Sequence, residues 1–366
     1  MKKKVGIITF HRVYNYGAVI QAYALQKILE SHDYDAEVID FSKDKQLDYT
    51  NIISRKNGLK RFLKTLVLFP VISKRIVRKK RFDSFLNQKV IMSKERYTHE
   101  TELNKIDCKY DAFICGSDQV WNPLKESDFS IAYMLDFTSK MKIAYAPSIG
   151  TATATDLKKY TQYLKKFSAL SCREKGGASI IHEVTGGEVS VVLDPTLLID
   201  KKEILKLVEE KEDVPYILYY SLDGYENKEK NMDILKTLSE KFGLNIKLIT
   251  PEWPFHGNIG TDVIDAGPIE FLSLIRNAAM VCTNSFHGTA LSIKLEKPFY
   301  VLEDFQIKDE RKRSVLKQLE LQDRVLSNVC EISNINDYTI DYVPVSEKLQ
   351  KLQKKSKEFL MNALEG

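Results

Sequence analysis

The order of apolar and polar residues predicts a strand, a helix and a second strand at the start of the chain. Residues 5–10 form a short apolar run of the kind found in a buried strand. Apolar residues then recur at helical spacing at Ala18, Val19, Ala22, Leu25, Ile28 and Leu29. Residues 36–40 give the next strand. This β-loop-α-β unit predicts a parallel sheet, which binds ligands at the carboxyl ends of its strands.

Further apolar runs continue the pattern in two series. The first series lies at residues 111–115, 143–146 and 169–172. The second series lies at residues 189–193, 216–220, 246–249, 280–283 and 299–302. We therefore predict an α/β protein with two Rossmann-like domains that face a cleft. The expected domains are residues 1–187 and 188–345, followed by an amphipathic helix over 346–366 that could pack back across the domain boundary or lie on the surface.

The composition agrees with two globular domains. A chain of 366 residues exceeds the size at which one hydrophobic core usually stops growing. Its 43% hydrophobic and 29% charged residues are ordinary for a globular protein and exclude general disorder. The net charge of +5 suits anionic small molecules, and no basic stripe interleaved with aromatic residues indicates nucleic acid.

Cysteine usage and the N-terminal residues predict a cytoplasmic protein. The five cysteines are widely spaced and include no Cys-x-x-Cys pair, which indicates reduced thiols. The basic start is followed by an apolar run that is too short for a signal peptide. No apolar run reaches the roughly eighteen residues that a membrane span requires.

A basic segment at residues 55–81 surrounds an apolar stretch at residues 66–72. Such a segment could lie on an anionic membrane surface as a peripheral contact at the inner membrane face. The ordinary alternative, which we favour, is a helical insertion with a solvated face. A membrane contact would matter if the substrate were carried on lipid.

Residues 280–294 run from an apolar strand through a short polar turn into a helix. The first backbone N–H groups of a helix lie at the positive end of its dipole, so this turn predicts an anion site. His287 would stand beside the anion as a proton donor. Gly288 would allow a ligand close to the backbone, while Ser285 and Thr289 would add hydroxyl donors. The alternative is an ordinary turn with a serine N-cap and a packed histidine.

Residues 111–122 contain another predicted strand, with a polar turn at its carboxyl end. Asp118 could act as a base or hold a hydroxyl group, and Gln119 and Asn122 could bind further hydroxyl groups. Trp121 would offer a flat face on which a sugar stacks. The alternative is a tight turn with a core tryptophan.

Three other positions have less specific patterns. The first turn contains Asn15 and Gly17, which could let the backbone approach a substrate, but it lacks a Gly-x-Gly-x-x-Gly fingerprint. Arg173 follows a strand and could bind a carboxylate or phosphate, or could simply lie on the surface beside Glu174. Asp194 is more typical of a helix cap than of a catalyst. The sequence contains no histidine or cysteine spacing typical of a metal site, no Gly-x-Ser-x-Gly elbow of a serine hydrolase and no P-loop.

Five blocks in order closely resemble the polysaccharide pyruvyl transferase family over about residues 5–325. They are Asn15-Tyr16-Gly17, residues 116–121, residues 171–174, residues 193–197 and residues 285–289. The resemblance implies a fold similar to GT-B glycosyltransferases. It also implies transfer of a pyruvyl group from phosphoenolpyruvate to two hydroxyl groups of a sugar, which forms a cyclic ketal.

The resemblance implies roles for particular residues. His287 and Asp118 would be catalytic, with His287 protonating C3 of phosphoenolpyruvate. The residues expected to bind phosphoenolpyruvate, the donor, are Arg173, Ser285, Phe286, Gly288 and Thr289. Those expected to bind the sugar acceptor, or its lipid-linked precursor, are Asn15, Tyr16, Gly17, Ser117, Gln119 and Trp121. Neither a metal nor a cofactor is expected.

Two other classes of function stay open at this stage. The first is a GT-B-type glycosyltransferase that uses a nucleotide sugar, with Glu303 as a candidate partner of the ribose. The second is a glycan-binding protein without catalysis. The acceptor sugar and the position of the ketal cannot be predicted from these residues.

Overall fold

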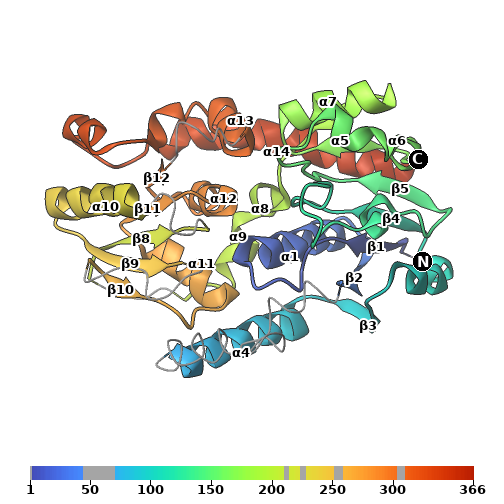
Figure 1. Ribbon diagram of the computed structural model, residues 1–366, viewed down its shortest axis with the longest axis horizontal. Coiled ribbons are helices and arrows are strands. Elements are labelled where there is room, and N and C mark those ends of the chain that lie inside the picture. The colour runs from blue at the N-terminus through green and yellow to red at the C-terminus, as the bar shows by residue number, and fades with distance from the viewer. Residues whose placement is uncertain (1, 44–70, 210–213, 223–227, 251–258, 303–309) are drawn as a thin grey trace. The chain divides into compact units, whose positions relative to one another are not determined.

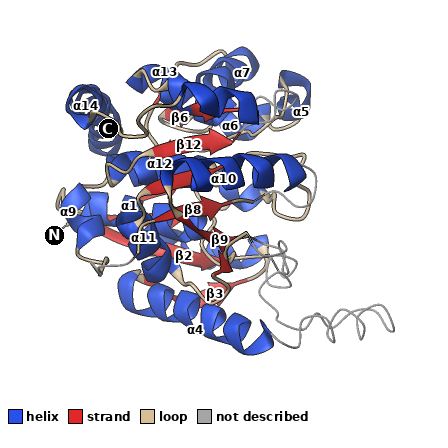
Figure 2. Cartoon of the chain, turned by 90° about the vertical axis from the view of Figure 1, so that its left-hand side faces the viewer, coloured by secondary structure: helices blue, strands red, loops and turns tan. Residues whose placement is uncertain are grey.

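The computed structural model describes residues 2–43, 71–209, 214–222, 228–250, 259–302 and 310–366. The chain divides into two compact units, each with its own sheet (Figures 1 and 2). Unit 1 contains Met1–Ser54, Asp83–Asp200 and Leu349–Gly366. Unit 2 contains Arg55–Phe82 and Lys201–Lys348. The chain therefore passes from unit 1 to unit 2 after residue 200, beyond the expected boundary at residue 187, and returns to unit 1 at residue 349.

Unit 1 has a parallel sheet with helices between its strands. Its elements, in which η denotes a 3₁₀-helix, are β1 (Lys4–Ile8), α1 (Tyr16–Glu30), β2 (Asp35–Phe41), β3 (Met92–Tyr97), η2 (Glu100–Lys109), β4 (Ala112–Cys115), η3 (Ile131–Met134), β5 (Met141–Ala144), α5 (Ala154–Lys158), α6 (Thr161–Leu164), β6 (Leu170–Cys172), α7 (Lys175–Thr185), β7 (Val189–Val191) and α8 (Pro195–Leu198). β6 pairs with β7 in a small separate sheet, and the other described strands of unit 1 form one sheet with the order β3-β2-β1-β4-β5. Neighbouring strands in this sheet are parallel, which is the arrangement of a Rossmann-like half.

Unit 2 repeats this plan. Its elements are α9 (Lys201–Leu205), β8 (Tyr216–Tyr220), α10 (Lys228–Phe242), β9 (Asn245–Ile249), β10 (Thr261–Asp262), α11 (Pro268–Asn277), β11 (Met280–Thr283), α12 (Phe286–Lys294), β12 (Phe299–Leu302), α13 (Glu310–Leu319), η4 (Gln322–Arg324), β13 (Val325–Leu326) and η5 (Val329–Asn334). The described strands have the order β10-β9-β8-β11-β12-β13, and all neighbours are parallel. The order again reverses beside the first strand of the unit, between β8 and β11.

Buried apolar side chains explain why the central strands lie where they do. All four residues of β4 are buried, as are those of β11 and β12. Strands that carry helices on both faces need such continuous apolar runs. Each unit has its own apolar cluster, around Phe113 and Trp121 in unit 1 and around Tyr219 and Leu235 in unit 2.

The structure corrects one predicted strand. The run at residues 189–193 was expected to open the second domain. Instead, β7 pairs in parallel with β6 inside unit 1. Ser190 and Val191 on this short strand are exposed, so its pairing depends on the backbone ladder rather than on burial.

Two helices contribute residues to both units. They are α4 (Ile72–Lys89) and α14 (Tyr342–Glu365). The C-terminal part of α14 belongs to unit 1, where Leu360 and Leu364 are buried and the main-chain oxygen of Leu364 accepts a hydrogen bond from Lys3. Most of the predicted basic segment, residues 55–70, lies outside the described residues. Within the described part of the chain, no helix has the length and apolar character needed to cross a bilayer.

Candidate functional site

The carboxyl edge of the unit 1 sheet gathers polar side chains at the point where the strand order reverses. The loop after β1 leads to Asn15, whose side chain caps α1 by accepting a hydrogen bond from the Ala18 N–H group. Tyr16 and Gly17 are buried at the start of α1. Asn15 is half-buried, so among these three predicted acceptor residues it has the most accessible surface.

Asp118 follows β4 with its backbone in the left-handed region, at φ 75°. This conformation is uncommon for a residue other than glycine, and aspartate is among the side chains that tolerate it. Its Oδ1 accepts a hydrogen bond from the backbone N–H group of Gln119 at 2.8 Å. Gln119 in turn accepts a bond from Asn122 Nδ2 at 3.0 Å. Asp118 and Gln119 are half-buried, so both have side-chain surface that a ligand could reach.

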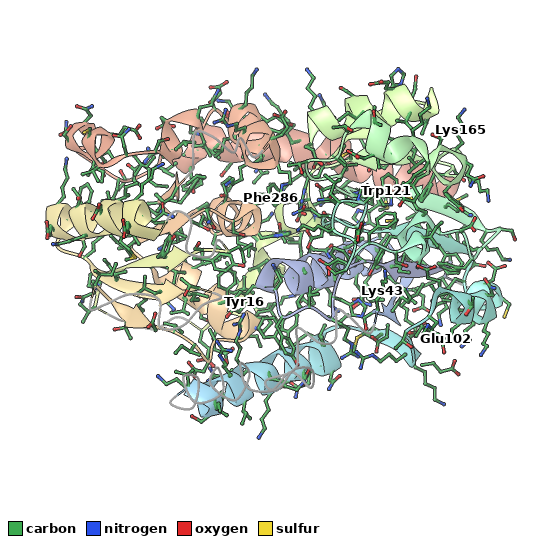
Figure 3. All side chains as sticks on the ribbon, viewed as in Figure 1. Tyr16, Lys43, Glu102, Trp121, Lys165 and Phe286 are labelled. Atoms are coloured by element: carbon green, nitrogen blue, oxygen red, sulfur yellow. The ribbon has the colours of Figure 1, made fainter. Side chains whose placement is uncertain are left out.

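Trp121 does not provide the stacking face that was expected. Its side chain is fully buried, and its indole N–H group donates to Tyr133 O at 2.9 Å. Its ring also packs edge-on against Phe167. Figure 3 labels Trp121 among the side chains of unit 1. The prediction that a sugar stacks on this ring is wrong because the apolar core of unit 1 covers both its faces, as the alternative of a core tryptophan requires.

Arg173 lies at the carboxyl end of β6 and is 5% exposed. Its Nη1 donates to Asp194 Oδ2 at 2.9 Å, and its Nε lies 3.9 Å from Glu174 Oε2. Burial alone would lower the pKa of Arg173, but the nearby carboxylates outweigh burial and raise it above its ordinary value. The alternative of a surface arginine is therefore wrong, and the guanidinium is a buried, permanently charged group.

Asp194 is the predicted helix cap, since its Oδ1 accepts a hydrogen bond from the Thr196 N–H group at the start of α8. Its Oδ2 accepts a second bond from Ser117 Oγ at 2.6 Å. Ser117, Arg173 and Asp194 are thus brought together in unit 1, although the sequence separates Ser117 from Asp194 by 77 positions.

Two buried acidic groups at this edge were missed in the sequence. Glu174 Oε1 accepts hydrogen bonds from Ser148 Oγ and the Ile149 N–H group. Asp40 near the end of β2 accepts bonds from Arg12 Nε at 2.8 Å and from His11 Nε2 at 3.1 Å. Burial raises the pKa of Asp40, but these two partners outweigh it and hold the pKa well below its usual range. Only the position of Asp40 at a strand end could have identified it.

The turn between β11 and α12 forms the corresponding edge in unit 2. Ser285 is the N-cap of α12, and its Oγ accepts a hydrogen bond from the Gly288 N–H group at 3.4 Å. Thr283 Oγ1 accepts a bond from the Ser285 N–H group. Thr289 Oγ1 donates to Ser285 O at 3.1 Å and is fully buried. The hydroxyl group of Thr289 therefore stabilises the turn.

Gly288 has a different role from the one predicted. A Cβ atom at this position would lie 2.4 Å from Thr283 Oγ1. The missing side chain therefore allows α12 to pack closely against the end of β11. The expectation that Gly288 makes room for a ligand is wrong for this reason.

Phe286 and His287 occupy the first two positions of α12, and each is 5% exposed. Their backbone N–H groups lie at the positive end of the helix dipole. The rings of the two residues meet nearly edge-on, 5.3 Å apart. Figure 3 labels Phe286 at the beginning of this helix.

Lys312 on α13 was not identified in the sequence as a site residue. Its Nζ donates to Asn284 O at 2.7 Å, directly before the N-cap of α12, and the side chain is 5% exposed. A buried ammonium group beside a helix N-terminus adds a full charge to the partial charge of the dipole. The sequence signal was weak because Lys312 lies within a run of basic residues.

Among the described residues, no group of three or more histidine, cysteine, aspartate or glutamate side chains is placed to hold a metal ion. The arrangement offers instead buried carboxylates in unit 1, and a lysine, an imidazole and helix N–H groups in unit 2. Carboxylates accept hydrogen bonds from hydroxyl groups, and the second set favours an anion.

Both sheets place these groups on a two-unit α/β fold of the GT-B type. Similar structures include UDP-GlcNAc 2-epimerase from Neisseria meningitidis bound to UDP-GlcNAc, with 12% identity, a TM-score of 0.53 and coverage of 100% of each chain. UDP-GlcNAc 2-epimerase from Methanocaldococcus jannaschii, in complex with UDP-GlcNAc and UDP, has 16% identity and a TM-score of 0.52, covering 100% of this chain and 99% of that chain. Such low identity supports a shared fold alone.

The family is defined by sequence. No curated protein matches the chain. The family model for polysaccharide pyruvyl transferase matches residues 15–304, which include Asp118, Arg173 and the turn before α12 but not Lys312. The chain therefore belongs to the polysaccharide pyruvyl transferase family.

Proposed function

We propose that this protein transfers the pyruvyl group of phosphoenolpyruvate to two hydroxyl groups of one sugar, in a polysaccharide or its lipid-linked precursor. Protonation at C3 turns the enol carbon C2 into an electrophile, to which the first hydroxyl group adds. Phosphate leaves, and the second hydroxyl group closes the cyclic ketal. Of the two hydroxyl protons, one ends in the new methyl group and the other on phosphate, so the reaction consumes no water.

The observation that carries this proposal is the turn before α12. Phosphoenolpyruvate bears a carboxylate and a phosphate, and the turn combines a helix N-terminus with the buried ammonium group of Lys312. His287 occupies the second position of the same helix. A histidine placed there can hold the proton that C3 receives. We assign phosphoenolpyruvate to this turn in unit 2 for these reasons.

The acceptor is assigned to the carboxyl edge of unit 1. Asp118 is half-buried and ionisable, so it can accept the proton of an attacking hydroxyl group. The neighbouring Gln119 amide and the half-buried Asn15 can bind other sugar hydroxyl groups. In this proposal, an Asp118→Asn variant keeps donor binding and loses transfer.

The first experiment measures thermal stabilisation by phosphoenolpyruvate and by a panel of nucleotide sugars. Ligand at about a hundred times its dissociation constant should stabilise the folded protein by roughly 2.7 kcal/mol. Stabilisation by phosphoenolpyruvate that is weakened in Lys312→Met, but kept in Asp118→Asn, supports the assignment. Phosphate release with an acceptor pool, followed by mass spectrometry of the product, then tests ketal formation.

Stabilisation by a nucleotide sugar alone would reject the proposal and favour a GT-B-type glycosyltransferase. Glu303, the candidate partner of a ribose in that alternative, lies outside the described residues. Stabilisation by neither class of ligand would favour a glycan-binding protein, which a glycan array would then test.

A peripheral membrane contact is part of the proposal if the acceptor is lipid-linked. Within α4, Lys74 and Lys80 are exposed, and Ile76 and Val77 between them are each 38% exposed. Cations around small apolar side chains suit the surface of an anionic bilayer, where each cation contributes about 1 kcal/mol.

Vesicle co-sedimentation tests this contact. Lys74→Glu/Lys80→Glu should reduce binding to vesicles that contain phosphatidylglycerol, with no binding to neutral vesicles in either form. The matched control is Lys351→Glu/Lys355→Glu, which changes two exposed lysines on α14. Equal binding by both double variants would reject a specific contact through α4.

A further inference from the structure

Asp194 connects two strand ends of unit 1 through a buried carboxylate. Its Oδ2 accepts hydrogen bonds from Ser117 Oγ at 2.6 Å and from Arg173 Nη1 at 2.9 Å. Its Oδ1 accepts bonds from the backbone N–H group and the hydroxyl group of Thr196, at 2.9 and 2.6 Å. Each oxygen therefore has two donors, which fixes the carboxylate in one orientation.

The backbone beside Asp194 is held from two other elements. The hydroxyl group of Tyr145, which follows β5, donates to Leu193 O at 2.9 Å. The Leu193 N–H group donates to Ser356 Oγ on α14 at 3.0 Å. All these groups belong to unit 1. Because these contacts hold the backbone next to Asp194, its carboxylate can fix the positions of the side chains that bind it.

The charges around Arg173 indicate how the fixed carboxylate of Asp194 affects the guanidinium group. Asp194 and Glu174 place two carboxylates around one guanidinium group. Arg173 therefore adds little net positive charge to this edge of unit 1. Its contribution would come from directed N–H groups, and directed hydrogen bonds depend on angle and distance more than net charge does.

We propose that Asp194 is a positioning residue of the acceptor edge of unit 1, which fixes the places of the Arg173 guanidinium and the Ser117 hydroxyl group beside Asp118. This inference rests on the proposed function, which assigns the sugar acceptor to this edge of unit 1. Asp194 itself need not touch either substrate. It acts through the two side chains that it holds.

Asp194→Asn is the informative variant. Asparagine caps helices as well as aspartate does, so the bond to the Thr196 N–H group is kept. The new NH₂ group, however, replaces Oδ2 and cannot accept the hydrogen bonds from Ser117 Oγ and Arg173 Nη1. We expect the KM for the acceptor to rise and kcat to fall, together by roughly 100-fold in kcat/KM, as for misplaced binding groups. Partial unfolding alone would lower the apparent kcat and leave KM unchanged.

Thr196→Val is the matched control. It removes one hydroxyl donor from Oδ1 and leaves both contacts of Oδ2 in place. Its melting temperature should fall while the KM for the acceptor stays at the wild-type value. An Asp194→Asn variant with the same KM as Thr196→Val would overturn the inference.

A double-mutant cycle tests whether Asp194 acts through Arg173. If it does, the loss in kcat/KM of Arg173→Gln/Asp194→Asn should be smaller than the product of the two single losses, and the loss beyond that of Arg173→Gln alone measures the effect through Ser117. Losses that multiply would overturn the inference, because they would mean that the two residues act independently.

A ligand-free measurement separates this inference from the proposed function. In ¹⁵N-arginine spectra, the wild type should show a slowly exchanging Arg173 side-chain signal, assigned by its absence in Arg173→Gln. The signal should vanish in Asp194→Asn and persist in Thr196→Val. If the wild type uses a nucleotide sugar instead of phosphoenolpyruvate, the proposed function fails, and the same variants are then assayed with that donor. A signal that persists in Asp194→Asn overturns the positioning role whatever the donor is.

Discussion

The carboxyl edges of the two sheets have the same topology but opposite chemistry. In unit 1, the strands end at buried acidic groups, among them Asp40, Glu174 and Asp194. In unit 2, β11 ends at a turn that combines His287, the first N–H groups of α12 and the ammonium group of Lys312. One Rossmann-like plan therefore supports a carboxylate-rich edge and an anion-binding edge.

This difference explains how the same fold could divide the work of a transferase. Sugar hydroxyl groups need acceptors and a base, whereas a phosphorylated donor needs cations and N–H donors. The half-buried Arg12 and the buried Arg173 of unit 1 do not contradict this division, because each is paired with an aspartate. The variants below test the contrast between the edges.

His287→Asn should have the largest effect on catalysis. Asparagine keeps polar groups at the start of α12 but cannot supply the proton that C3 receives. We expect kcat to fall by about 10²–10⁴-fold, the usual contribution of a positioned acid. Phosphate release under saturating phosphoenolpyruvate measures this effect. Wild-type turnover in His287→Asn would show that His287 is not the acid, and would contradict the assignment of the donor and its acid to unit 2.

Lys312→Met should raise the KM for phosphoenolpyruvate by roughly 10- to 100-fold, as expected when a charged hydrogen-bonding partner is lost. The KM for the acceptor should stay unchanged, because the acceptor is assigned to unit 1. Lys317→Met, an exposed lysine on the same helix, is the matched control. An equal change in both substrates' KM values would contradict the assignment of the donor to unit 2.

The sequence predicted those parts of the fold that depend on local patterns. Apolar runs identified the buried strands β4, β8, β9, β11 and β12, and the helical spacing identified α1. The pattern misassigned β7, because a short apolar run does not say which sheet it joins. The strand β3 was missed, since its residues are mostly polar and partly exposed.

The site could be predicted only where one segment carries several of its groups. The Ser285 cap and the Asp194 cap follow from local sequence, and both are confirmed. Long-range contacts were not accessible in this way. The burial of Trp121, the bond from Lys312 to Asn284 and the pairing of Arg173 with Asp194 each depend on the folded chain.

Gly288→Ala tests whether the geometry of the unit 2 turn depends on close packing. The added Cβ atom would lie 2.4 Å from Thr283 Oγ1, so α12 must shift or Thr283 must move. Overpacking of this kind should reduce the free energy of unfolding by about 1–3 kcal/mol, measured by urea denaturation. Gly187→Ala is the control, because the nearest atom to its new Cβ would be 3.7 Å away. Equal stability of both variants would show that the turn has room.

Asp40→Asn should have the smallest effect on turnover, and its effect on stability should depend on pH. His11 and Arg12 hold the pKa of Asp40 below its usual range, which is about 3.9 in an unfolded chain. Between these two pKa values the unfolded chain binds more protons, so the stability from this carboxylate is present at neutral pH and is lost as pH falls below about 4. Melting temperatures of the wild type and Asp40→Asn should therefore differ at pH 7 and converge in acid.

Asp136→Asn provides the control for this pH dependence. Asp136 pairs with Lys166 on the surface, with a side chain that is 38% exposed. Solvent screens such a pair, so its loss should change the melting temperature little at either pH. If the gap between wild type and Asp40→Asn were as large at pH 3 as at pH 7, the carboxylate would not be the source of the stability. The acidic edge of unit 1 would then depend on packing around His11 and Arg12, and its contrast with unit 2 would be one of shape rather than charge.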